Sequence, residues 1–189
     1  MSAQDSKLFV ISGPSGAGKG TLVTRVRERR SNLGLTVSAT TRAPRKGEVD
    51  GVNYFFLTRE EFDRRVANGE FVEWAEVHGN CYGTLLSEVQ SKLASGASLI
   101  LEIDVQGALQ VKERFPEAVL IFIKPPSLEV LRERLVGRGT ETPETIELRM
   151  ANAADELALA DRYDDVVVND DLDRATDELV RVLDMHERI

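Results

Sequence analysis

Residues 13–21, Gly-Pro-Ser-Gly-Ala-Gly-Lys-Gly-Thr, constrain the fold of this chain more than any other segment. They follow the apolar run 8–11 and precede a helical pattern over 19–30, so the order is strand, glycine-rich loop, helix. Glycine allows backbone turns with positive φ, which lets N–H groups and the positive end of a helix dipole converge on one anion. The pattern predicts a phosphate-binding loop whose Lys19 reaches the β- and γ-phosphates of a nucleotide.

The position after Lys19 is Gly20, where such loops commonly carry a serine or threonine hydroxyl for magnesium, and Thr21 follows one place later. The protein contact of the metal is therefore left open. The alternative, a glycine-rich turn that binds nothing, would leave the agreement of strand, loop, lysine and helix unexplained.

Composition narrows the possible partners. The chain has 189 residues, a net charge of -8 and one cysteine, Cys81, so no intrachain disulfide can form. An acidic chain is poorly suited to neutralising nucleic-acid phosphates, and any anionic ligand needs a local basic cluster. No apolar run approaches a membrane span, and residues 1–7 lack the pattern of a secretory signal. We expect a cytoplasmic protein without nucleic-acid or membrane partners, whose oligomeric state stays open.

Hydrophobic periodicity predicts an α/β fold with a doubly wound parallel sheet, because nearly uninterrupted apolar strands alternate with helices. A lobe of short strands and helices is expected as an insertion between Gly34 and Gly96. Within it, residues 78–83 are expected to form a turn-rich connection, and Trp74 is expected in the core. Strands are predicted at 35–38, 53–57, 71–77, 99–105, 118–123 and 165–169, and helices over 58–69, 85–94, 107–115 and 172–189, from Ser127 and from Thr142.

Charged residues stand out in three places. Glu102 and Asp104 end a buried strand, where ligands of open α/β sheets gather, so they are candidates to lie near magnesium and phosphates. Alternatively, one of these acids caps the next helix. The loop 40–48 is basic, and segment 134–141 combines arginines with glycines, as a mobile phosphate-binding lid would. From composition alone, both segments could equally be solvated connections.

Several segments together resemble the guanylate kinase family, and their spacing covers nearly the whole chain. They are residues 13–21, 38–48 with Gly51 and Tyr54, 71–74, 82–84, 102–107, 137–141 and 168–169. The resemblance implies the reaction ATP + GMP → ADP + GDP with Mg²⁺, and leaves dGMP open as an acceptor. It also implies a phosphate-loop core (1–37, 97–133 and 150–189), an inserted mixed α+β GMP-binding lobe (38–96) and a short lid (134–149).

The resemblance assigns roles to individual residues. Lys19, Arg42, Arg138 and Arg149 are implied as catalytic, and the guanine pocket is implied to be Ser38, Glu73, Thr84 and Asp104. Arg42, Arg45, Tyr54 and Tyr82 are implied to hold the GMP phosphate. ATP is implied to bind Gly13, Pro14, Ser15, Gly16, Ala17, Gly18, Lys19, Gly20, Thr21, Arg138 and Asn169. Thr21, Glu102, Asp104 or water are the candidate metal contacts.

The choice of Glu73 agrees with hydrogen-bonding chemistry. Guanine presents two N–H donors that one carboxylate can accept together, whereas adenine presents a bare N1 acceptor. Without the resemblance, Glu73 would be interpreted as an exposed strand acid.

Three alternatives remain. Another kinase on this scaffold would lack the guanine set, and a scaffolding module that binds phosphopeptides would typically lose a working phosphate loop. A regulatory GTPase would need an Asn-Lys-x-Asp motif, which the sequence lacks.

Overall fold

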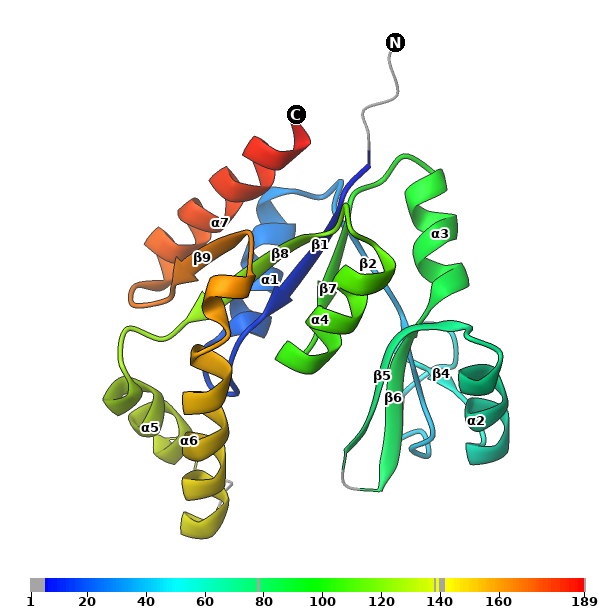
Figure 1. Ribbon diagram of the computed structural model, residues 1–189, viewed down its shortest axis with the longest axis horizontal. Coiled ribbons are helices and arrows are strands. Elements are labelled where there is room, and N and C mark those ends of the chain that lie inside the picture. Colours follow the sequence, from blue (N-terminus) through cyan, green and yellow to red (C-terminus); the bar gives the residue numbers. More distant parts are fainter. Residues whose placement is uncertain (1–5, 78, 138, 140–141, 189) are drawn as a thin grey trace.

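The computed structural model describes residues 6–77, 79–137, 139 and 142–188. Its main sheet has five strands in the order β2-β7-β1-β8-β9, and all neighbouring pairs run parallel, which confirms the predicted parallel sheet (Figure 1). The strands are β1 (Leu8–Ser12), β2 (Gly34–Leu35), β7 (Leu99–Glu102), β8 (Val119–Lys124) and β9 (Asp165–Val168).

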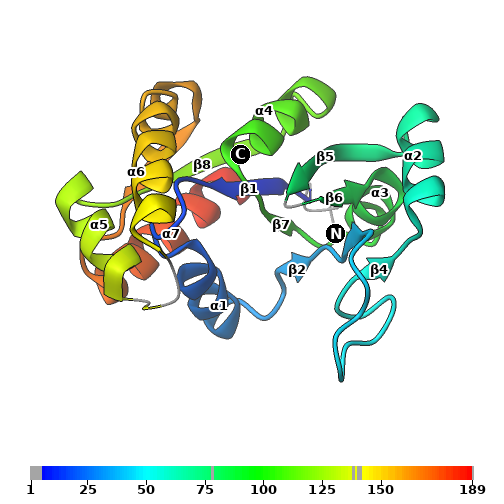
Figure 2. The ribbon, with the colours of Figure 1, turned by 90° about the horizontal axis from the view of Figure 1, so that it is seen from below.

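Helices cover both faces of this sheet (Figures 1 and 2). α1 (Lys19–Arg29) and α7 (Leu172–Glu187) pack on one face, where they meet Phe9 and Ile11 of β1. α4 (Val105–Arg114) packs on the other face against Leu8 and Val10. Because successive side chains of a strand point to opposite faces, both sets of residues are buried, which accounts for the continuous apolar runs in the sequence.

A second sheet of four strands has the order β4-β3-β6-β5 and lies beside the main sheet. In it, β3 and β4 pair in parallel, while β3–β6 and β5–β6 are antiparallel. Its core of buried residues is small and includes Phe62 of α2 and Cys81. The elements are β3 (Ser38–Thr40), β4 (Phe55–Phe56), α2 (Arg59–Ala67), β5 (Phe71–Val77), β6 (Asn80–Leu85) and α3 (Leu86–Ala94).

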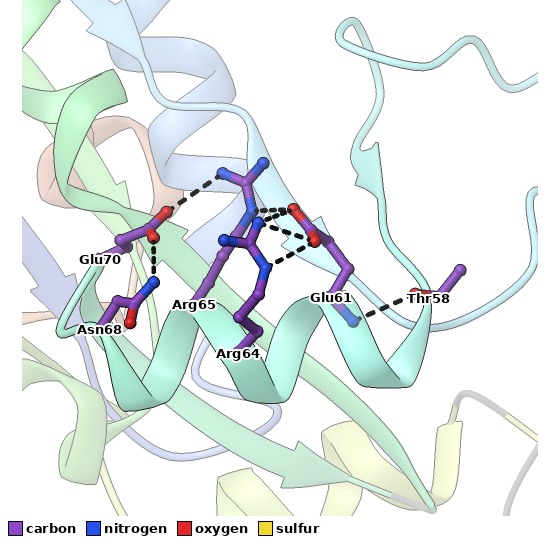
Figure 3. A network of polar contacts seen from close by, with 6 residues as sticks. All are labelled: Thr58, Glu61, Arg64, Arg65, Asn68 and Glu70. Atoms are coloured by element: carbon purple, nitrogen blue, oxygen red, sulfur yellow. Dashed lines mark hydrogen bonds and ion pairs between the residues drawn. The ribbon is translucent and has the colours of Figure 1, made fainter.

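Helix α2 begins at Arg59, after its capping residue Thr58, and a network of polar contacts lies on its outer face (Figure 3). The Thr58 hydroxyl accepts the N–H of Glu61 at 3.1 Å. The Glu61 carboxylate accepts hydrogen bonds from Arg64 and Arg65 at 2.8 Å. These contacts lie on the exposed side of the second sheet's helix, and each exposed ion pair contributes little to stability, roughly 0.2–1 kcal/mol.

Two predictions within the inserted region are wrong. The single strand expected over 35–38 is split, since β2 pairs in the main sheet and β3 begins the second sheet. Residues 80–85 form strand β6 rather than a turn. A glycine fits there because a Cβ at Gly83 would lie 2.7 Å from the carbonyl oxygen of Glu73 on the adjacent strand. Both errors arise because strand pairing depends on partners distant in the sequence.

Other differences concern the edges of the fold. Trp74 is 40% exposed rather than in the core, although its ring contacts Phe62 edge-on. Strand β7 ends at Glu102, three residues earlier than predicted, because Asp104 caps α4. The strand expected over 53–57 is reduced to β4, Phe55–Phe56.

The segment 134–149 includes the ends of two helices. α5 (Leu128–Gly137) is followed by α6 (Pro143–Leu157), which Thr142 caps as predicted, and then by a short 3₁₀ helix, η1 (Ala160–Arg162). Among the residues that the structure describes, no helix is both long and apolar enough to cross a membrane.

Candidate active site

The loop between β1 and α1 is packed so tightly that two of its glycines cannot carry side chains. Gly13 has φ of 140°, and a Cβ there would lie 2.3 Å from the carbonyl oxygen of Ile123 on β8. Gly18 has φ of 90°, and a Cβ there would lie 2.4 Å from the Asn169 side-chain nitrogen. Only glycine can adopt a positive φ without strain next to such close neighbours. The main chain of the loop therefore lines the space at the start of α1.

Two basic side chains meet this loop. The Lys19 ammonium donates to the carbonyl oxygens of Gly13 at 2.5 Å and Pro14 at 3.1 Å. Arg149 reaches across from α6 and donates to the Ser15 hydroxyl. The structure thus brings Lys19 and Arg149 to the same loop from different elements. Such cations beside a glycine-rich helix start can neutralise bound phosphate groups.

Asn169 and Arg134 brace the loop from the side of β9 and α5. The buried Asn169 amide donates to the carbonyl oxygen of Ala17 at 2.8 Å, and Arg134 donates to the Asn169 carbonyl oxygen at 2.7 Å. Both residues line a cavity of about 350 Å³ with Gly16, Gly18, Thr21, Asp170 and Leu172. Asn169, which the resemblance implies as an ATP contact, therefore lines this cavity, while its side chain supports the loop.

Oxygen atoms of the kind that could bind a metal ion lie beside the loop. The Glu102 carboxylate is 3.4 Å from the position that a Cβ on Gly20 would take, next to Thr21 in the first turn of α1. Partial burial raises the pKa of Glu102, and the charge of Lys19 opposes this rise. A carboxylate, a hydroxyl and substrate phosphates form the hard oxygen set that Mg²⁺ prefers, with water filling other positions, so these residues fit the ion.

Asp104, the third metal candidate, has a different partner. Its carboxylate accepts the N–H of Gly107 at 2.7 Å and caps α4, as the alternative interpretation proposed. Among the described residues, no group of three or more carboxylate, histidine or cysteine side chains is arranged to hold a metal ion.

The second sheet places three polar residues in one row. Ser38 of β3 pairs with Thr84 of β6, and Thr84 pairs with Glu73 of β5. The Thr84 hydroxyl donates to Glu73 at 2.8 Å, and Glu73 is only 8% exposed. A buried carboxylate is costly unless it is paired, so Glu73 is not the exposed strand acid of the alternative interpretation.

The protonation of Glu73 is set by its surroundings. Burial raises the pKa of Glu73 to about 7, in spite of the hydrogen bond from Thr84, and the negative charge of Asp104 adds to the rise. Gly107 of α4 lies so near that a Cβ there would be 3.1 Å from a Glu73 carboxylate oxygen. The site holds a carboxyl group that gives up its proton near neutral pH and can then accept two hydrogen bonds.

A cluster of aromatic and basic residues lies two residues farther along β3 and β6. Tyr82 pairs with Thr40, and its ring is 6.3 Å from that of Tyr54. The guanidinium of Arg42 lies 5.4 Å from the Tyr54 ring centre. Arg45 is on the same loop with its side chain exposed. The second sheet therefore has a row of polar residues at one level and a cationic cluster at the next.

A cavity of about 270 Å³ is lined by the glycine-rich loop, by α6 and by the end of β5. Its lining includes Ser15 of the loop, Arg149 and Glu156 of α6 and Val77 at the end of β5. The raised pKa of Glu156 results from burial, and the charge of Lys19 opposes it. Arg138, the other predicted lid arginine, lies outside the described residues.

Sequence reasoning missed roles for three residues here. Glu48 forms an ion pair with Arg42, and Gly107 leaves room for the Glu73 side chain. Arg134 donates a hydrogen bond to the Asn169 carbonyl oxygen. A signal existed for Arg134, which falls between the buried Leu131 and Leu135 on the inner side of α5. For Glu48, the signal was an acid placed within an otherwise basic loop.

Comparison with known proteins decides the family. The model of the guanylate kinase family matches residues 5–186. The chain belongs to the guanylate kinase family. A guanylate kinase from Gloeobacter violaceus is 57% identical over 94% of this chain and 87% of its own length. One from Halalkalibacterium halodurans is 52% identical over 97% of this chain and 90% of its own length.

A solved structure agrees with this membership. The crystal structure of guanylate kinase from Anaplasma phagocytophilum has a TM-score of 0.75 and 36% identity, and the match covers 97% of this chain and 87% of that one. Membership in the guanylate kinase family accounts for the phosphate loop and the second sheet together, which a regulatory GTPase would not require.

Proposed function

We propose that this protein transfers the γ-phosphoryl group of ATP to GMP, giving ADP and GDP, and so acts in purine nucleotide metabolism. The observation that carries the proposal is the buried Glu73 carboxylate, paired with Thr84 and in one row with Ser38. A carboxylate in that position can accept the N1–H and N2–H of guanine, whereas adenine would leave it without donors.

The acceptor nucleotide binds along the second sheet. Its guanine lies in the row of Ser38, Glu73 and Thr84, with Asp104 beside Glu73. Its phosphate lies at the next level, where Arg42, Tyr54 and Tyr82 come together. Arg45, on the same loop, supplies a second guanidinium. The match of two adjacent levels to a base and a phosphate supports this orientation.

The donor nucleotide binds at the glycine-rich loop. The backbone of residues 13–21 and the ammonium of Lys19 hold the ATP phosphates, and the cavity beside Asn169 and Arg134 receives the adenine. Mg²⁺, when bound with the nucleotide, neutralises part of the charge on the β- and γ-phosphates. Thr21 and Glu102 would hold it, through oxygen atoms or intervening water.

The reaction requires no general base, because the attacking oxygen belongs to a phosphate that is largely ionised at neutral pH. What the chain must supply is the approach of two polyanions and neutralisation of their charge. Arg149, together with Arg138, closes on the transferring group. In this proposal residues 38–96 form the GMP-binding lobe and 134–149 the lid, and both move toward the core (1–37, 97–133 and 150–189) when substrates bind.

A turnover assay with a panel of acceptors tests the proposal. ADP release from ATP is measured with GMP, dGMP, AMP, CMP and UMP, with and without Mg²⁺. We expect rapid, Mg²⁺-dependent turnover with GMP and turnover at least 10³-fold slower with AMP, because polar groups left unpaired in a buried site penalise binding. Absence of ADP with GMP, or faster release with another base, would overturn the proposal. Comparison of turnover with dGMP and with GMP shows whether the protein recognises the 2′-hydroxyl of the ribose.

A further inference from the structure

One acidic residue, Glu48, lies among the cationic residues of the second sheet, where a phosphate-binding cluster has no evident need for a carboxylate. Its two carboxylate oxygens are 2.8 and 3.0 Å from the Nη2 atom of Arg42. The side chains are only 15% exposed for Arg42 and 19% exposed for Glu48. An ion pair sheltered to this degree is screened less by solvent and salt than a surface pair.

The loop backbone fixes Glu48 in turn. Its carboxylate accepts the N–H of Arg45 at 2.6 Å, and its own N–H donates to the Arg45 carbonyl oxygen at 3.0 Å. The intervening Gly47 has φ of 91°, which closes this tight turn. The hydrogen bond from Arg42, followed by that from the Arg45 backbone, lowers the pKa of Glu48. The carboxylate is therefore ionised at neutral pH and is held by hydrogen bonds from Arg42 and the Arg45 backbone.

Arg42 is held on several sides as a result. Besides the two bonds to Glu48, its Nη1 atom donates to the Ala43 carbonyl oxygen at 2.7 Å. The guanidinium also lies over the rings of Tyr54 and Phe56, at 5.4 and 5.8 Å from their centres. A guanidinium has five N–H donors, and these bonds use three of them. The remaining donors serve the neighbouring Tyr82 and an incoming anion.

We propose that Glu48 is a positioning residue for the acceptor phosphate, acting through Arg42. Its carboxylate holds the guanidinium in one orientation before GMP binds, so that the phosphate meets an N–H donor whose direction is already fixed. Preorganised donors need no reordering when the ligand arrives. Arg45, whose side chain is exposed, is the arginine that adapts. This inference rests on the proposed function, because it assigns the cationic cluster to the phosphate of GMP.

Glu48→Gln tests the role, since it keeps the size of the side chain and removes its charge. Dissociation constants of GMP and guanosine are measured by calorimetry, because guanosine has the same base without the phosphate. We expect GMP binding to weaken about tenfold and guanosine binding to stay within twofold, with KM for ATP unchanged. Guanosine binding also reports that the second sheet is folded. Glu61→Gln is the matched control, because Glu61 also binds arginines on the same sheet's helix (Figure 3), and it should change neither ligand.

A double-mutant cycle with Arg42→Ala shows whether Glu48 acts through that arginine. In the Arg42→Ala background, Glu48→Gln should have no further effect on GMP binding. Tighter GMP binding by Glu48→Gln would make Glu48 a competing anion and overturn the proposal. Equal losses for GMP and guanosine, or a tenfold loss that persists without Arg42, would also overturn it. Turnover of GMP by the unmodified protein is measured first, so that failure of the proposed function appears there and not in the variants.

Discussion

The two nucleotide sites proposed for this protein are built from different materials. The donor site is mainly backbone, because Gly13 and Gly18 turn beside a buried sheet and have no room for a Cβ. The acceptor site consists of side chains on a smaller second sheet, namely Arg42, Tyr54, Glu73 and Tyr82. A backbone cradle recognises phosphate groups regardless of the base attached to them, whereas side chains distinguish one base from another. In this proposal, substrate identity is determined on the second sheet.

The largest effect should come from Gly13→Ala in the donor site. The new methyl group would meet the Ile123 carbonyl oxygen, whose backbone cannot move without disturbing β8. We expect kcat/KM for ATP to fall at least 10³-fold, while GMP still binds. Gly96→Ala is the control, because Gly96 also has a positive φ, 82°, but no atom lies within 4 Å of the added carbon. Full activity of Gly13→Ala would show that the cradle tolerates a side chain.

The pH dependence of base binding should show the second largest effect. In the proposed complex guanine donates to the ionised carboxylate, and the pKa of Glu73 is raised to about 7 in the unliganded protein. Below this pH the Glu73 carboxyl must lose its proton before guanosine binds. The dissociation constant of guanosine should therefore increase up to tenfold for each pH unit below 7. Above pH 8 it should be constant. Guanosine is used because the second ionisation of the GMP phosphate, at pKa about 6, would add its own dependence.

Glu73→Gln serves as the control for this profile, because the amide does not titrate. The variant should bind guanosine weakly and equally from pH 6 to pH 8. A constant dissociation constant for the unmodified protein over the same interval would contradict the assignment of the guanine contact to Glu73.

A smaller effect is expected from Gly107→Ala. The added carbon would lie 3.1 Å from a Glu73 carboxylate oxygen, close enough to displace the side chain by a few tenths of an ångström. We expect KM for GMP to increase about three- to fivefold, because hydrogen bonds weaken as their geometry worsens, and KM for ATP to remain unchanged. Equal changes in the KM values for GMP and ATP would show that the substitution disturbs α4 as a whole and not the guanine contact alone.

The sequence predicts the donor side better than the acceptor side, for physical reasons. The loop at 13–21, the buried parallel strands and the cap at Thr142 depend on residues that are close in the sequence, so local patterns predict them. Strand β6 and the separation of β2 from β3 depend on pairing between distant segments, and local patterns fail there.

The acceptor side also depends on contacts that no local pattern contains. The ion pair between Glu48 and Arg42 requires the loop to fold back on itself. The burial of Glu73 requires α4 to lie beside β5, where Gln110 accepts the N–H of Trp74 at 3.3 Å. The resemblance to a family implies Glu73 as a base contact, but only the structure explains why its pKa is raised.

The most direct test of the division between the two sites is the steady-state kinetics of Glu73→Gln with each substrate varied in turn. Replacing the carboxylate by an amide removes one charge-assisted hydrogen bond to guanine, which is worth about 1.5–3 kcal/mol. We expect kcat/KM for GMP to fall roughly 10- to 100-fold and KM for ATP to remain within twofold. Glu76→Gln, at an exposed acid on the same strand, should behave like the unmodified protein. An unchanged kcat/KM for GMP, or an equal loss for both substrates, would contradict the claim that the second sheet selects the acceptor.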